Sequence, residues 1–414
     1  MHRWKALVLL CCFVIIYFNF STYLPLKLRY EINTKVLSSS LNTEESIQKS
    51  QYTRVNTEEP IPRFIGTNSE NQENSYQSHP FLILTYNTWF GGAWPIYSSS
   101  TCSFNTSMFQ MTNDKALFSI SHVVMFHSRD MPSIQKLERL NRFRGKKQLW
   151  IYFTMESVYN NPSVDSINKY FNATATYGTD TDIEMPYRYH SRRHRVIDSI
   201  SKNYFINKKN MVVWLVSNCQ SDARNKLALK LISYGVDIKI IGKCSSEIQK
   251  NILSKCTKVP CYKPYYQQSL KNFILYLRSF KFYFSAENSL CDGYITEKYW
   301  ETGLNNDLIP IVLGGSNYSD PRLAVPGSFI EAMSFDSPKA LANYILDVSS
   351  NSNKYNSFFE WKKNWQLDSS SRFCMLCDKL RNGFILRKNP LMKTMNKEKC
   401  TRPQEKFNIW INKN

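Results

Sequence analysis

The sequence has no glycine-rich phosphate loop. Glycine is scarce, at 13 of 414 residues, and none lies in the connection Ser217-Asn218-Cys219-Gln220 between a predicted strand at 211–216 and a predicted helix at 222–234. Walker and dinucleotide-binding motifs need glycine in that connection, because the backbone must come close to the phosphates. The sequence therefore excludes both motifs.

A second Cys-x-x-Cys pair, which would complete a zinc site with Cys374 and Cys377, is also missing. Nine of the eleven cysteines follow an N-terminal apolar run, and in an oxidising compartment they would form disulfides. Because nine is an odd number, at least one of them stays unpaired or pairs between chains. The disulfide candidates are Cys102, Cys219, Cys244, Cys256, Cys261, Cys374, Cys377 and Cys400.

The apolar run covers residues 6–26. A helix of about 20 such residues spans a membrane, and no small-residue cleavage pattern follows, so an uncleaved anchor is preferred to a signal peptide. Basic residues lie on both sides of the run, and charge alone does not decide its orientation. The cysteines and three glycosylation acceptors favour a lumenal C-terminal part. These acceptors are Asn105, Asn172 and Asn317.

Short apolar strands alternate with helices after a polar segment that we interpret as a flexible stem. Strands are predicted at 81–86, 122–126, 149–153, 211–216, 236–241, 280–285 and 309–313, and helices at 222–234, 296–305 and 339–348. This alternation predicts two doubly wound α/β domains that face each other across a cleft. The predicted parts are a cytoplasmic tail (1–5), a membrane anchor (6–26), a lumenal stem (27–78), an N-terminal domain (79–209), a C-terminal domain (210–365) and a basic, cysteine-containing extension (366–414).

The formal net charge of +20 fits nucleic acid, an anionic membrane or a phosphate-bearing small molecule as a partner. Much of the excess lies in residues 188–209 and after residue 379, which we interpret as a solvated linker and tail. A lumenal membrane protein does not meet nucleic acid. We therefore expect no nucleic-acid partner.

Polar residues follow the carboxyl ends of several predicted strands, which is where ligands bind in open α/β sheets. These residues are His127, Arg129, Asp130, Glu156, Ser157, Ser217, Asn218, Glu287 and Asn288. Arg224 lies in the first turn of the helix predicted at 222–234, with Ser221 as its expected N-cap. The positive end of a helix dipole suits a phosphate group. The sequence thus predicts a ligand site at the strand ends, with Arg224 facing an anion.

The stretch FYFSAENSLCDGYITEKYW at 282–300 resembles the signature of the α1,3-fucosyltransferase family, in which Phe-Glu-Asn-Ser leads to Asp-Tyr-x-Thr-Glu-Lys. Other stretches are similar to the family as well: VVMFHSRD at 123–130, WIYFTMES at 150–157, DTDIEMPY at 180–187, VVWLVSNC at 212–219 and CMLC at 374–377. The resemblance covers most of the chain between about residues 80 and 380. Two departures are Gly293, where the family pattern has Asp, and Val158-Tyr159-Asn160 in place of a Pro-containing continuation.

This resemblance implies an inverting glycosyltransferase of the GT-B type, built of two Rossmann-like domains. It would move L-fucose from GDP-fucose to a GlcNAc hydroxyl of a glycan, with α1,3 as the expected linkage. It also implies a single-pass type II protein of the Golgi membrane and no essential divalent metal. Asp180-Thr181-Asp182 resembles the acidic pair that holds Mn²⁺ in another class of glycosyltransferases, but it follows no strongly apolar strand, so we expect no metal site.

Roles follow from the resemblance residue by residue. Glu156 matches the general base, Arg224 and Lys298 match contacts to the diphosphate, and the acceptor-side candidates are His127 and Arg129. Further candidates for binding the sugar nucleotide are Asn288, Tyr294, Glu297, Ser217, Asn218 and Glu287.

The resemblance leaves several questions open. Family members tie the pair at 374–377 to N-terminal cysteines, but Cys102 is the only one between Cys12 and Cys219, so Cys400 is a candidate second partner. The acceptor is a lactosamine antenna, an N-glycan core or a sialylated chain, and transfer to the 4-position and a homodimer both stay open. The non-enzyme alternative is a lumenal, lectin-like membrane protein.

Overall fold

The structure is a computed structural model, and it describes residues 80–94, 102, 106–242, 244, 270–368, 372–383 and 390–413. The chain divides into two units between residues 60 and 61, and every described residue belongs to the second unit. The predicted tail, anchor and stem lie outside the described residues, as do Asn105, Cys256 and Cys261. No helix within the described ranges is long and apolar enough to cross a membrane.

The first half of the described chain forms a six-stranded sheet in the order β2-β1-β3-β4-β5-β6. Its strands are β1 (Phe81–Thr85), β2 (Phe109–Thr112), β3 (Val123–His127), β4 (Leu149–Thr154), β5 (Ala173–Thr176) and β6 (Ile183–Glu184), with helix α3 (Ile134–Arg142) between β3 and β4. All neighbouring strands are parallel. Every residue of β3, β4 and β5 is buried, which is why the first two appear in the sequence as continuous apolar runs.

The second half forms a five-stranded sheet in the order β12-β11-β10-β8-β9. Its strands are β8 (Asn210–Leu215), β9 (Ile238–Ile241), β10 (Phe280–Ala286), β11 (Ile309–Leu313) and β12 (Ile330–Glu331), and its helices include α4 (Asp222–Ser233), α6 (Leu270–Leu277), α7 (Pro338–Ser350) and α8 (Ser352–Ser357). These strands are parallel too. The prediction of an α/β fold with two parallel sheets is confirmed.

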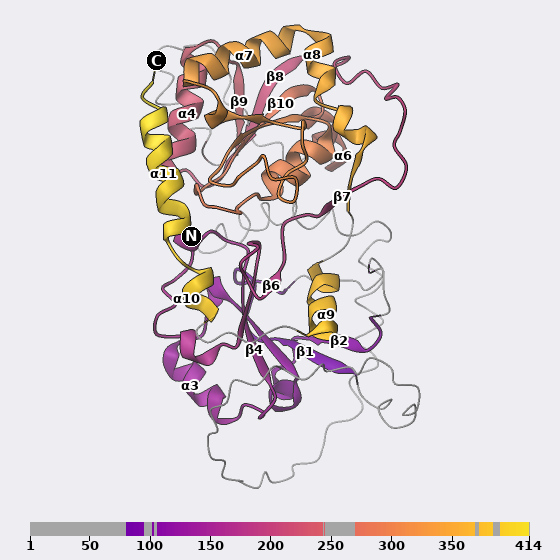
Figure 1. Cartoon of the computed structure of the whole chain (residues 1–414). Coiled ribbons are helices and arrows are strands. Elements are labelled where there is room, and N and C mark those ends of the chain that lie inside the picture. The colour runs from indigo at the N-terminus through magenta and orange to yellow at the C-terminus, as the bar shows by residue number, and fades with distance from the viewer. Residues whose placement is uncertain are drawn as a thin grey trace. The chain divides into compact units, whose positions relative to one another are not determined.

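The C-terminal residues pack on both sheets (Figure 1). Helix α9 (Arg372–Asn382) contacts β6 and helix α10 (Pro390–Thr394) contacts β5, whereas helix α11 (Glu398–Trp410) lies along α4. In addition, β7 (His190–Arg192) pairs in antiparallel fashion with β13 (Trp365–Leu367). The residues predicted as an extension at 366–414 therefore hold elements of both halves together.

The helix predicted at 296–305 has a different form. It consists of a π-helical segment, Lys298–Gly303, followed by a 3₁₀ turn, Leu304–Asn306. A Cβ atom at Gly303 would lie 2.8 Å from Cγ of Pro310, so β11 passes close to this segment. Single-turn π-helical segments occur frequently at functional sites. This one carries Lys298 from the signature stretch.

Candidate active site

Glu156 lies two residues after β4, on a turn whose backbone is held by side chains. The Glu156 amide donates a 3.1 Å hydrogen bond to Oγ1 of Thr154, and Nδ2 of Asn160 lies 3.4 Å from Oε2 of Glu156. Asn161 donates to the carbonyl oxygens of Glu156 (3.1 Å) and Ser157 (2.7 Å), and its Oδ1 accepts from the Thr154 hydroxyl (2.9 Å). The position of the Glu156 carboxylate therefore depends on a hydrogen-bonded turn.

The signature stretch holds a lysine between two carboxylates. Nζ of Lys298 lies 3.1 Å from Oε2 of Glu287 and 3.0 Å from Oε1 of Glu297, and it donates a 2.7 Å hydrogen bond to Oγ1 of Thr296. Glu287 is fully buried and also accepts hydrogen bonds from the Thr296 amide (2.9 Å) and hydroxyl (2.8 Å). Glu287 therefore organises the start of this helix and fixes the ammonium group.

Charges in this cluster shift each other's protonation. Burial alone would lower the pKa of Lys298, but Glu287 and Glu297 outweigh it, and the pKa of Lys298 is raised. Burial raises the pKa of Glu287, and Lys298 opposes only part of that effect. Burial would likewise raise the pKa of Glu297, but Lys298 more than compensates, and the pKa of Glu297 is lowered. Lys298 is therefore a fixed cation at physiological pH.

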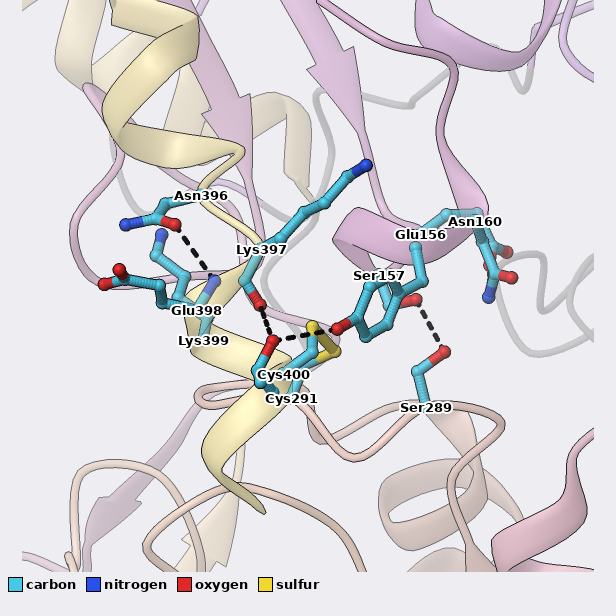
Figure 2. Close-up of a disulfide and its surroundings, with 12 residues drawn as sticks. Glu156, Ser157, Asn160, Ser289, Cys291, Asn396, Lys397, Glu398, Lys399 and Cys400 are labelled. Atoms are coloured by element: carbon cyan, nitrogen blue, oxygen red, sulfur yellow. Dashed lines mark hydrogen bonds between the residues drawn. A yellow bond between two sulfur atoms is a disulfide. The ribbon is translucent and has the colours of Figure 1, made fainter. Parts of the chain in front are cut away.

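Charged side chains that follow strands of both sheets shift the pKa of Glu156. Burial raises the pKa of Glu156; Lys298 and Arg129 lower it in part, and Glu297 raises it further. Arg129 follows β3, whereas Lys298 and Glu297 follow β10. The hydroxyl of Ser157 donates a 2.8 Å hydrogen bond to that of Ser289 (Figure 2). The structure thus brings together strand-end residues that the sequence predicted to converge.

Arg224 lies in the first turn of α4 and is only 2% exposed. It donates through Nη2 to the carbonyl of Asn218, and its Nε is buried without a hydrogen-bond partner among the described residues. Burial lowers the pKa of Arg224, and Glu287 counteracts this in part. Ser221 occupies the N-cap position as predicted, but its hydroxyl donates to the carbonyl of Asn288 (2.8 Å) instead of capping the helix.

Tyr294 is 1% exposed and packs against two tyrosines from the first half of the described chain. Its ring centroid is 4.8 Å from that of Tyr177 and 6.3 Å from that of Tyr187, and the Tyr187 hydroxyl donates to the carbonyl of Met155. Gly293, at the departure from the family pattern, has a φ of +71°, which glycine adopts without strain. The tyrosines therefore connect the signature stretch to the end of β4 by packing.

His127 and Arg129 differ in accessibility. His127 is 1% exposed, and its ring stacks on Trp89 with centroids 4.8 Å apart. Burial lowers the pKa of His127 to about 4, although Asp130 opposes the shift, so the ring is neutral at physiological pH. Arg129 is exposed and donates to the carbonyl of Asn160. An acceptor could contact His127 only if the aromatic rings packed around it moved, whereas Arg129 is accessible without any rearrangement.

A cavity of about 910 Å³ is lined by residues from both halves of the described chain. Its lining includes the predicted site residues Asn218 and Asn288, and also Asn160, but not Glu156, Arg224 or Lys298. Its full lining is Tyr159, Asn160, Asn218, Gln220, Ser221, Asp222, Ala223, Lys226, Leu229, Lys230, Asn288, Ser289, Leu290, Gln404, Asn408, Ile411 and Asn412. Ser217, another predicted site residue, is exposed at the start of the connection from β8 to α4.

Three disulfides lie among the described residues: Cys102–Cys374, Cys219–Cys244 and Cys291–Cys400. The proposed partnership of Cys400 with the pair at 374–377 is wrong, because Cys400 bonds to Cys291 within the signature stretch (Figure 2). Sequence reasoning left Cys291 out of the disulfide candidates. Cys377 is buried and forms no disulfide with a described residue.

The remaining candidates have structural partners. Asp180 forms a 2.6 Å ion pair with Lys399, and Asp182 accepts a 2.8 Å hydrogen bond from the Thr174 amide. No group of three metal-ligating side chains occurs within the described ranges. Among the predicted glycosylation acceptors, Asn317 is exposed, whereas Asn172 is half-buried and accepts a 2.8 Å hydrogen bond from the Trp150 amide.

A carboxylate, a fixed ammonium group and a buried guanidinium group at the carboxyl edges of two parallel sheets define an α/β enzyme with a site for an anionic ligand. Residues 78–188 match the family described as "Fucosyltransferase, N-terminal", and residues 205–396 match "Glycosyltransferase family 10 (fucosyltransferase) C-term". The chain belongs to the fucosyltransferases of glycosyltransferase family 10. It is therefore an enzyme, which decides against the lectin-like alternative.

Two mammalian relatives are similar over most of the chain. The 3-galactosyl-N-acetylglucosaminide 4-alpha-L-fucosyltransferase of Bos taurus is 28% identical over 348 residues, which cover 80% of this chain and 87% of the relative. The 4-galactosyl-N-acetylglucosaminide 3-alpha-L-fucosyltransferase 9 of Homo sapiens is 29% identical over 301 residues, which cover 70% of this chain and 76% of the relative. A solved alpha1,3-fucosyltransferase is 16% identical, with a TM-score of 0.43, and the match covers 72% of this chain and 84% of that one.

Proposed function

We propose that the protein transfers L-fucose from GDP-fucose to a hydroxyl group of GlcNAc in a glycan, by a single inverting displacement. The observation that carries this proposal is that the turn bearing Glu156 meets the signature stretch through the 2.8 Å hydrogen bond from Ser157 to Ser289, close enough for Lys298 to act on the Glu156 carboxylate. The two relatives carry 3- and 4-fucosyltransferase names, and the family signature favours α1,3 transfer for this chain. The acceptor carries GlcNAc on a glycoprotein or glycolipid.

Glu156 serves as the general base. Inversion by single displacement needs one base that takes the proton from the acceptor hydroxyl on the face opposite the leaving group. Burial raises the pKa of Glu156, which makes its carboxylate a stronger base, and the nearby Lys298 and Arg129 help to keep it ionised. The turn held by Asn161 fixes the direction of the side chain.

Lys298, Arg224 and the N-terminus of α4 stabilise the departing GDP. Negative charge grows on the diphosphate as the sugar leaves, and cationic groups that are fixed beforehand stabilise it without reorganisation. Lys298 is held by Glu287 and Glu297, and Arg224 by the Asn218 carbonyl. Because these groups supply positive charge, we propose that turnover needs no divalent metal. Asn288, Tyr294 and Glu297 complete the sugar-nucleotide side of the site.

The proposed cellular setting is the Golgi membrane, with the described part of the chain in the lumen. Residues 6–26 act as the signal-anchor of a single-pass type II protein, residues 27–78 as the stem, and the two α/β domains face a cleft as in the GT-B arrangement. Three disulfides support an oxidising compartment.

The test is to offer the full-length, detergent-solubilised protein GDP-fucose and an array of glycans, with and without a chelator. We expect fucose on GlcNAc-containing glycans, with linkage assigned by NMR, and no effect of the chelator. The absence of incorporation on every glycan would contradict the proposed activity. Loss of activity on chelation would contradict the metal-free mechanism alone.

A further inference from the structure

The cavity of about 910 Å³ has two helical walls. Asp222, Lys226 and Lys230 line it from α4, Gln404 and Asn408 line it from α11, and Asn412 lines it from the turn after α11. Residues four apart lie on one face of a helix, so each wall is a single continuous helix face. We call this space the α4/α11 groove.

The wall formed by α11 is anchored at both ends. Phe407 and Trp410 are buried in the core of the C-terminal sheet, and Trp410 donates a 2.6 Å hydrogen bond through Nε1 to the carbonyl of Phe335. At its other end, the disulfide from Cys400 to Cys291 joins α11 to the signature stretch (Figure 2). The groove is therefore a preformed feature, because its walls are fixed without a ligand.

The chemistry of the lining suits a neutral, polyhydroxylated ligand. Seven of the lining side chains are carboxamides: Asn160, Asn218, Gln220, Asn288, Gln404, Asn408 and Asn412. A carboxamide both donates and accepts hydrogen bonds, as a sugar hydroxyl does. Asp222 and Lys226 form a 2.7 Å ion pair, so their charges offset each other, and Lys230 is left as a single cation in the lining. Tyr159, which is 51% exposed, adds an aromatic ring at the edge of the groove.

One end of the groove reaches the proposed base. Asn160 lines the groove, and its Nδ2 lies 3.4 Å from Oε2 of Glu156. Arg224 and Lys298, the cations proposed to bind the diphosphate, are not part of the lining, whereas Asn288 and the N-terminus of α4 are shared with the proposed sugar-nucleotide side. The volume is at the upper end of the range for pockets that enclose a whole small ligand. It therefore offers room for more than the one sugar that reacts at Glu156.

We propose that the α4/α11 groove binds the sugars of the acceptor glycan that lie beyond the fucosylated GlcNAc. This proposal rests on the proposed function, and it makes the enzyme prefer extended, neutral oligosaccharides over short ones. Gln404 and Asn408 are the specificity-determining residues, because they line the groove from α11, whereas Glu156, Arg224 and Lys298 lie on other segments and outside the lining.

The experiment compares a disaccharide acceptor with a hexasaccharide that contains the same reacting disaccharide. The variant is Gln404→Ala/Asn408→Ala in the full-length protein, and the matched control is Glu405→Ala/Ile409→Ala, which changes exposed residues of α11 outside the groove lining. Alanine favours helices, so both variants should fold. We expect a KM for the hexasaccharide that rises by about tenfold in the variant, as for the loss of two hydrogen bonds. The control, the disaccharide kinetics and the KM for GDP-fucose should not change.

Other outcomes would overturn the proposal. Equal KM values of the wild type for the two acceptors would show that the groove adds nothing to acceptor binding. A raised KM for GDP-fucose in the Gln404→Ala/Asn408→Ala variant would assign the groove to the nucleotide. If the wild type transfers to neither acceptor, the proposed function itself fails, and this result is distinct from a wild type that transfers to both without preference.

Discussion

The hydroxyl of Ser157 donates a 2.8 Å hydrogen bond to the hydroxyl of Ser289, and this bond joins the two sides of the candidate site (Figure 2). Ser157 directly follows Glu156, and Ser289 directly follows Asn288. The bond therefore sets the proposed base against the signature stretch across 132 residues of sequence.

Removal of this bond should affect turnover more than folding. A hydrogen bond contributes about 1 kcal/mol, so we expect Ser157→Ala to lower kcat/KM about fivefold. Ser289→Ala should have a similar effect, and the double variant should be no worse than either single one, since both remove the same bond. Additive losses in steady-state kinetics would show that the two hydroxyls act separately. Ser319→Ala, at an exposed position, is the control.

Arg129 should set the acidic limb of the pH profile. Burial raises the pKa of Glu156, and the positive charge of Arg129 lowers it in part. Arg129→Gln removes this charge, so the pKa of Glu156 rises and its carboxylate becomes protonated at a higher pH. We expect the acidic limb of kcat/KM to move to higher pH in Arg129→Gln and to stay in place in Arg129→Lys. An unmoved limb in Arg129→Gln would mean that another group controls it.

Asp307 lies just before β11, at the edge of the C-terminal sheet opposite the strand ends of the candidate site, and it pairs with two lysines. Asp307 lies 2.6 Å from Nζ of Lys202 and 2.5 Å from Nζ of Lys362. Burial would raise the pKa of Asp307, but the two lysines outweigh it, and the pKa lies below the usual 3.8. The ion pairs therefore stabilise the fold above pH 3.8, and this contribution is lost as the pH falls through the lowered pKa.

Asp307→Asn isolates the charge, because Asp307 has a φ of +57° that asparagine also tolerates. We expect the variant to lose about 2 kcal/mol of unfolding free energy at pH 7, with a smaller loss near pH 3 and normal fucosyl transfer at pH 7. Denaturant unfolding at both pH values measures this difference. The same loss at both pH values would contradict an electrostatic origin.

The disulfide from Cys291 to Cys400 should support donor binding. It joins α11 to the residue next to Asp292, whose amide donates a 2.9 Å hydrogen bond to the carbonyl of Lys399. In the Cys291→Ser/Cys400→Ser variant we expect a loss of about 2–4 kcal/mol of stability and a raised KM for GDP-fucose. Cys377→Ala, which removes a buried thiol outside any described disulfide, is the control for cysteine removal. An unchanged KM for GDP-fucose would show that the signature stretch holds its shape unaided.

The sequence predicted the central parallel strands because they are buried on both faces and therefore form apolar runs. It also located the polar residues after β3, β4, β8 and β10, since ligand sites in such sheets follow strand ends. It missed short elements such as β6 and β12, which have two residues each. Periodicity needs a longer segment to be visible.

Other features depend on contacts between distant residues. The bond of Cys291 to Cys400 spans 109 residues and leaves no local pattern. The burial of His127 against Trp89 also depends on tertiary packing, as does the use of Ser221 to hold Asn288 instead of capping α4. The π-helical form of Lys298–Gly303 has no local pattern in the sequence either, since propensity alone predicts an ordinary helix.

Glu156→Gln tests whether Glu156 takes the proton from the acceptor hydroxyl. Glutamine keeps the size and most hydrogen bonds of the side chain but cannot act as the base. The measurement pairs single-turnover transfer with calorimetric GDP binding on the same preparation. We predict that transfer falls by a factor of at least about 100 while GDP affinity stays within about twofold. Normal transfer in Glu156→Gln would rule out Glu156 as the base.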